Sequence, residues 1–197
     1  MEAVLEHDAN EAVFEKRDVM SPATVQEHLS TPEGAPYFQF INGEAIYCPT
    51  PPLLHQQLLQ NVILAMDVFV SPHDLGEMIL SPVDLYFNDK ELFMPDISFV
   101  SHERKHIMTA ERLIGAPDLV AEILSPSTGY YDLTHKKFVY EQEGVREYWL
   151  VYPDERRIEI YTNSDDGFQI HSQARAKGAV KSLVLSGLEL SIDAVFE

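Results

Sequence analysis

A single acidic residue interrupts an apolar run in the segment PDLVAEILSPST, which spans residues 117–128. The run predicts a buried strand, and Glu122 lies in its middle. A lone ionised carboxylate in an apolar sheet is strongly destabilising, or its pKa changes, unless another group pairs with it. The segment therefore predicts a cationic partner for Glu122. Its apolar neighbours are Leu119, Val120, Ala121, Ile123 and Leu124.

A second carboxylate, Asp96, lies in another predicted strand, FMPDISFV. Period-two alternation places Asp96 on one strand face with Met94, Ser98 and Val100. If this strand neighbours that of Glu122, the two carboxylates converge, and they repel each other unless a cation or a shared proton neutralises them. Oxygen-binding Mg²⁺ or Mn²⁺ is the natural cation. The alternatives are that Asp96 caps a loop and that Glu122 pairs with a core arginine or lysine.

Lys136 is the candidate cation for this pair. It lies in a helix predicted from about Asp132 to Glu143, and at about 100° per residue it falls within the apolar arc of that helix. Lys137 falls at the edge of the arc. The alternative is a solvated i,i+4 pair between Asp132 and Lys136, worth a few tenths of a kcal/mol. The arc itself contains Leu133, Val139 and Tyr140.

Three further residues are weaker candidates. His55 begins the longest predicted helix, residues 55–70, and could face the same cleft, although a lone histidine at a helix start is more often structural. Glu44 follows the Asn42-Gly43 turn. Asp118 lies about 13 Å from Glu122 along an extended strand, so its expected role is local.

The segment HERKH, His102 to His106, satisfies the H-E-x-x-H pattern of zinc peptidases, in which two histidines one helical turn apart bind zinc and the glutamate acts as a base. Charged residues, Arg104 and Lys105, occupy the variable positions, and a predicted strand ends just before. This context favours a solvated helix or loop. A zinc metallopeptidase stays a minor alternative.

Composition limits the classes of partner. The 197-residue chain is 45% hydrophobic and carries a formal net charge of −18, which argues against a broad nucleic-acid footprint. Any phosphate partner would need bound cations or a local basic cluster, for which the runs ERKH and HKK are candidates. Cys48 is the single cysteine, so no intramolecular disulfide forms. We find no signal peptide or apolar run of membrane-spanning length, and we expect a cytoplasmic protein without a membrane partner.

The predicted elements follow the order helix, three strands, helix, strand, which indicates an α/β (α+β) domain with a mixed central sheet. Two of the strands are the runs EMILSPVDLYFND and ELFMPDISFV, joined at residues 88–90. An additional N-terminal hairpin is predicted around Asn42-Gly43, and a C-terminal hairpin around the turn NSDDG. Residues 1–20 are expected to form an acidic tail or short helix, and residues 21–197 a single domain.

Four segments together resemble the Uma family of restriction endonucleases, within the PD-(D/E)XK nuclease superfamily. They are MPDISFV, GAPDLVAEILSPST, YDLTHKKFVY and GVREYWLVYP, and the resemblance extends from about Ser21 to Phe196. It implies a restriction-endonuclease-like αβββαβ core, with Asp96 as the aspartate of the "PD" element and Glu122 as the acid of the third strand. The superfamily lysine two residues after that acid is replaced here by Leu124. Lys136 in the next helix is the expected substitute.

The resemblance also implies an activity: hydrolysis of DNA phosphodiester bonds with Mg²⁺ or Mn²⁺. Asp96, Glu122 and the backbone carbonyl of Ile123 would bind the metal, and Lys136 would orient a water molecule. His55 and Glu44 match recurrent family positions. A homodimer would suit the cleavage of both strands of a duplex. The alternative is a non-catalytic interaction protein that keeps the nuclease fold.

Overall fold

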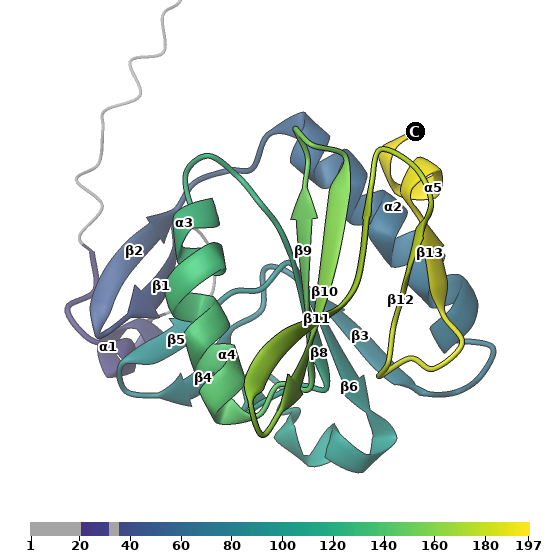
Figure 1. The fold of residues 1–197 in the computed structure, drawn as a ribbon. Coiled ribbons are helices and arrows are strands. Elements are labelled where there is room, and N and C mark those ends of the chain that lie inside the picture. Colours follow the sequence, from purple (N-terminus) through teal and green to yellow (C-terminus); the bar gives the residue numbers. More distant parts are fainter. Residues whose placement is uncertain (1–20, 32–35) are drawn as a thin grey trace, which may run out of the picture.

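The computed structural model of the chain describes residues 21–31 and 36–197 (Figure 1). The acidic tail or short helix expected at residues 1–20 lies outside the described residues. The centre of the fold is a six-stranded mixed sheet in the order β11-β10-β9-β8-β6-β3, in which only β8 and β9 run parallel. Its strands are β3 (Gly76–Leu80), β6 (Ile97–Ser101), β8 (Leu119–Ile123), β9 (Glu147–Tyr152), β10 (Arg157–Ser164) and β11 (Gly167–Arg175).

The αβββαβ core is confirmed. The long helix α2 (Leu53–Val70) is followed by β3, β6 and β8, then by a second helical segment and β9. That second segment runs through α3 (Gly129–Tyr131), a π-helical turn η2 (Asp132–Lys136) and α4 (Lys137–Glu143). It ends where predicted, because Gly144 adopts a left-handed conformation with φ of 85°.

A second sheet of five strands has the order β2-β1-β5-β4-β7. It corrects the prediction of two long strands, because each predicted run breaks at a proline and its two halves join different sheets. The breaks fall at Pro82 and Pro95, where the backbone lacks the N–H needed to continue a ladder. The strands of this sheet are β1 (Tyr37–Ile41), β2 (Glu44–Cys48), β4 (Leu85–Asn88), β5 (Glu91–Phe93) and β7 (Leu113–Ile114).

The two faces of the central sheet have different covers (Figure 1). Buried residues of α2 pack on the face that carries Ile97, Ala121 and Trp149. The opposite face carries Val120 and Leu150, and it packs against α4 and the second sheet. Glu122 follows Val120 by two residues, so its side chain points to this second face. Beside α2 lie the pair β12 (Ala179–Lys181) and β13 (Glu189–Ser191) and the short helix α5 (Ile192–Phe196).

The apolar composition of α2 follows from this packing. By length and mean hydropathy alone, 1.2 over 18 residues, the helix could cross a membrane. In the fold its buried residues, among them Leu58, Val62 and Met66, belong to the core cluster of the central sheet. The chain runs from the β1–β2 hairpin directly into the first turn of α2, so the packing of this helix also fixes the position of the hairpin. The short helix α1 (Val25–Ser30) packs Val25 against the far side of the same hairpin.

Candidate active site

The two predicted carboxylates meet across the ladder between β6 and β8. Ile97 pairs with Ala121, so the next residues outward, Asp96 and Glu122, lie opposite each other. The Asp96 N–H donates to Glu122 Oε2 at 3.3 Å, and the Ile123 N–H donates to Asp96 Oδ2 at 2.7 Å. The predicted convergence of the two side chains is confirmed, and backbone bonds on both strands fix their positions.

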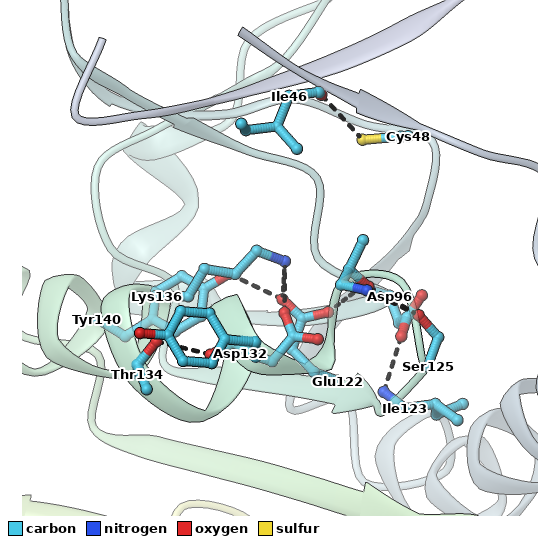
Figure 2. Close-up of polar contacts among 12 residues, drawn as sticks. Ile46, Cys48, Asp96, Glu122, Ile123, Ser125, Asp132, Thr134, Lys136 and Tyr140 are labelled. Carbon is cyan, nitrogen blue, oxygen red and sulfur yellow. Dashed lines mark hydrogen bonds and ion pairs between the residues drawn. The ribbon is translucent and has the colours of Figure 1, made fainter. Parts of the chain in front are cut away.

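Lys136 is the cationic partner that the sequence required for Glu122 (Figure 2). Its Nζ lies 3.0 Å from Glu122 Oε1 and 2.8 Å from Asp132 Oδ1. The Tyr140 hydroxyl also donates to Glu122 Oε1, at 3.0 Å. The i,i+4 pair of Asp132 with Lys136 therefore exists as well, but it is buried rather than solvated, since the two residues are only 2% and 3% exposed.

The π-helical turn explains how Lys136 reaches the sheet. An i→i+5 turn inserts an extra residue, which shifts the register of the side chains that follow it. Leu133, predicted in the core, is consequently 43% exposed, whereas Val139 and Tyr140 are buried as predicted. Lys137 points elsewhere, with its Nζ 3.4 Å from the centre of the Tyr161 ring.

Burial sets the electrostatics of this cluster. The pKa of Glu122 is raised to about 8: desolvation is the main cause, the charge of Lys136 acts against it, and the charges of Asp132 and Asp96 add to it. Desolvation likewise raises the pKa of Asp132. For Lys136 desolvation acts in the other direction, but the two carboxylates outweigh it and its pKa is raised. The three carboxylates outnumber the one lysine, and a bound cation would offset that surplus.

His55 joins the cluster from the first turn of α2. Its Nε2 lies 3.2 Å from Asp96 Oδ2, and the residue is 8% exposed. Desolvation lowers its pKa, but the bond to Asp96 and the charge of Asp96 outweigh that effect and raise the pKa overall. The other ring nitrogen, Nδ1, is buried and has no hydrogen-bond partner among the described residues. The predicted placement of His55 in the cleft is therefore found.

A cleft of about 360 Å³ opens onto these residues. Its floor is the Asp96–Glu122–Lys136 cluster, and its roof is formed by the β1–β2 hairpin and the proline-rich linker to α2. Cys48 lies on the roof, across from the cluster (Figure 2). Burial raises the pKa of the Cys48 thiol to about 11, so it remains neutral near pH 7. Other lining residues are Tyr37, Gln39, Pro49, Pro51, Pro52, Ser81, Met94, Ser125 and Thr128.

Two predicted candidates lie away from the cleft. Glu44 is exposed at the first position of β2, pairs with Ile41 across the hairpin and does not line the cleft. The turn that precedes it carries its side chain to the end of the hairpin remote from Cys48, so Glu44 is not brought together with the other candidates. Asp118 has the local role expected of it: its carboxylate accepts from the Ser101 N–H at 2.8 Å and pairs with Arg146 at 3.1 Å.

The H-E-x-x-H segment forms a 3₁₀-helix, η1 (His102–Ile107), rather than the α-helix that the zinc pattern requires. At three residues per turn, side chains four positions apart point about 120° away from each other, so His102 and His106 do not share a face. His102 instead lies 3.1 Å from the exposed Asp74. The charged, solvated segment favoured by the sequence is found.

The oxygen atoms around Asp96 suit a hard divalent cation. Asp96, Glu122 and the backbone carbonyl of Ile123 offer two carboxylates and one neutral oxygen, which matches the preferences of Mg²⁺ and Mn²⁺. In residues 21–31 and 36–197 no three His, Cys, Asp or Glu side chains are grouped to hold a metal by themselves. Water or substrate oxygens would therefore complete the shell, as Mg²⁺ commonly requires.

Sequence reasoning gave Asp132 and Tyr140 only helical roles, and both contact the central pair. The Lys136 ammonium binds both Asp132 and Glu122, and Glu122 accepts hydrogen bonds from both Lys136 and Tyr140. A usable signal was present in D-x-x-x-K-x-x-x-Y, where three polar groups recur at a spacing of four residues on one helix face. The pattern did not reveal that the face is buried.

A model of the Uma2 family, described as "Putative restriction endonuclease", matches residues 25–193. Two relatives come from Synechocystis sp., and both are described as uncharacterized proteins. One, slr1290, is 31% identical over 135 residues, which cover 66% of this chain and 68% of the relative. The other, sll1609, is 27% identical over 146 residues, which cover 73% and 82% of the two chains.

A solved structure supports the same fold. It is a protein of Anabaena variabilis ATCC 29413, described as "a putative nuclease belonging to DUF820". The two structures match with a TM-score of 0.73 at 26% sequence identity, over 89% of this chain and 98% of the other. The α+β fold predicted from the sequence is thereby confirmed.

Proposed function

The chain belongs to the Uma2 family, as its motifs indicated, and we propose that it is a divalent-metal-dependent nuclease that hydrolyses phosphodiester bonds in DNA. The supporting observation is the placement of Asp96, just before β6, opposite Glu122 on β8, with the buried Lys136 paired to Glu122. Mg²⁺ or Mn²⁺ is the proposed cofactor.

Each residue of the cluster has a proposed task. Asp96, Glu122 and the Ile123 carbonyl would hold the metal, which when bound supplies a Lewis acid and lowers the pKa of a water molecule. Lys136 would orient the attacking water and offset negative charge in the transition state. His55 would keep Asp96 in position through its Nε2. These tasks need no large movement, since backbone N–H groups already hold both carboxylates.

Metal titration and DNA cleavage test the proposal on the full chain. Asp96→Asn and Glu122→Gln should each lower Mn²⁺ affinity in a calorimetric titration and abolish cleavage of a mixed single- and double-stranded DNA substrate. Lys136→Ala and Lys136→Arg should also abolish cleavage, because a planar fork cannot replace a compact ammonium in a crowded site. Lys137→Ala is the matched control and should retain activity, since its side chain lies on Tyr161.

A non-catalytic protein that keeps the nuclease fold is the second candidate. The buried ion pairs of Lys136 with Glu122 and Asp132 favour it, since such networks also serve folding alone. Unchanged Mn²⁺ affinity in both carboxylate variants, together with no cleavage by the wild type, would support this candidate and defeat the proposed nuclease.

A further inference from the structure

The cleft is poor in the positive charge that duplex DNA requires. Lys136 is the only lysine or arginine that lines it within residues 21–31 and 36–197, and its ammonium already serves two carboxylates. The other arginine and lysines of the two basic runs are engaged elsewhere: Arg104 lies 3.5 Å from Asp118, Lys105 pairs with Glu77 at 2.9 Å and Lys137 lies on Tyr161. Duplex binding depends on lysines and arginines that neutralise phosphates along both strands. This cleft offers no such track.

The roof limits the size of what can enter. A cleft of about 360 Å³ lies near the lower end of the range for pockets that hold one small molecule. Its roof continues from β2 through Pro49, Pro51 and Pro52 into the first turn of α2. Each proline fixes a backbone dihedral, so this linker is stiff. The space above Glu122 therefore suits one nucleotide unit better than a stacked base pair.

The wall of the cleft carries groups suited to an unpaired base. Tyr37 and Gln39 alternate along β1, so both side chains lie on the hairpin face that carries Cys48, and all three line the cleft. Tyr37 is 37% exposed and offers a ring for stacking. Gln39 is 2% exposed, yet no hydrogen bond among the described residues uses its side-chain amide. Since that amide is not among the buried polar atoms left without a partner, it opens onto the cleft and is free to bond a ligand there.

We propose that the cleft binds one unpaired nucleotide, so that the substrate is single-stranded DNA; this inference rests on the proposed nuclease function. Tyr37 would stack on the base and Gln39 would donate to and accept from its edge, as amide side chains do with bases. The neighbouring phosphodiester would then lie over Asp96, Glu122 and Lys136. Aromatic stacking tolerates any base and needs little positive charge, which agrees with a net charge of −18.

Fluorescence anisotropy separates single strands from duplex. A labelled 12-nucleotide strand and the same strand in a duplex are titrated with the full chain in Ca²⁺. We expect the single strand to bind at least about tenfold more tightly. Tyr37→Leu should lose about tenfold in single-strand affinity, whereas Tyr37→Phe keeps the ring and should stay within about twofold of wild type. Gln39→Leu should weaken binding and change the preference among homopolymer strands.

The outcomes distinguish this inference from the proposed function. Equal or tighter duplex binding, no binding of either DNA, or single-strand affinity that is unchanged by Tyr37→Leu would overturn the inference. Efficient cleavage of duplex but not of single strands with Mg²⁺ would also overturn it while leaving the nuclease proposal intact. Tyr37-dependent binding of single strands without any cleavage would support the inference and contradict the nuclease proposal.

Discussion

At the scale of single residues, Lys136 holds together two buried carboxylates that would otherwise face each other. We expect Lys136→Met to lower the free energy of unfolding by about 3–5 kcal/mol at pH 7, because Glu122 and Asp132 keep their burial and lose their cation. The deficit should grow at pH 9, because Glu122, whose pKa is raised to about 8, is then ionised without a cation beside it. Urea unfolding at the two pH values measures the effect.

Lys137→Met is the matched control for that measurement. Lys137 is adjacent in sequence, but its main contact is the ring of Tyr161, so its loss should cost less than about 1 kcal/mol. Equal urea midpoints for the two variants would contradict the central position of Lys136 in the cluster.

Glu122 should also connect metal binding to proton release. Because its pKa is raised to about 8, most of the metal-free protein carries a proton on Glu122 at pH 7. Glu122 binds its proton more tightly in the folded state than in the unfolded state. The free energy of unfolding of the metal-free protein should therefore fall as pH rises from about 4.5 to 8. A metal requires the ionised carboxylate and should expel the proton.

Calorimetric titration in buffers of different ionisation enthalpy measures that proton. We expect Mn²⁺ binding to the wild type to release a substantial fraction of one proton at pH 7 and little at pH 9. Glu122→Gln removes the titrating group and should abolish both the release and its pH dependence. Release that stays the same at both pH values would show that Glu122 is already ionised in the metal-free protein.

At the scale of elements, the 3₁₀-helix η1 is a structural anchor. Arg104 Nη1 donates to the carbonyl oxygen of Ala116 at 2.9 Å, and its Nε lies 3.5 Å from the buried Asp118. We expect Arg104→Ala to lower the free energy of unfolding by about 2–3 kcal/mol, because a buried carboxylate and a carbonyl lose a charged donor. Thermal unfolding measures the change.

Neighbours in η1 are the controls for this prediction. Lys105→Ala removes only a surface pair with Glu77, and His102→Ala and His106→Ala remove solvated side chains, so each should cost less than about 1 kcal/mol. Stoichiometric zinc that is present in the wild type and lost in the two histidine variants would instead restore the peptidase alternative.

Local sequence patterns predicted those elements whose structure is set locally. The Asn42-Gly43 turn predicted the β1–β2 hairpin, and period-two alternation predicted the strand faces of Asp96 and Glu122, which converge because β6 and β8 are neighbours. Period 3.6 placed Lys136 toward the sheet, but it also placed Leu133 there, because no local pattern announces a π-helical turn. The division of the proline-broken runs between two sheets depends on long-range pairing, which alternation alone does not specify.

At the scale of the whole molecule, the net charge limits which nucleic acid the protein can bind. The chain carries a net charge of −18, so its own field repels a polyanion except where a cation or an uncharged contact compensates. The expected homodimer followed from cleavage of both strands of a duplex. A single-stranded substrate needs only one active site. The homodimer therefore stays a prediction, and cleavage of a single strand does not require it.

The salt dependence of DNA binding tests this balance. For single strands, the slope of log K against log salt is about −0.7 for each phosphate neutralised. With Lys136 as the only lysine or arginine lining the cleft among the described residues, we expect a slope shallower than about −2 in the presence of Ca²⁺. Anisotropy titrations of a labelled single strand in about 50–200 mM salt measure it.

Lys137→Ala should leave the slope unchanged, because Lys137 lies on Tyr161 away from the cleft. A slope steeper than about −4 would require several cations on the path of the strand, and the binding surface would then have to extend well beyond the cleft.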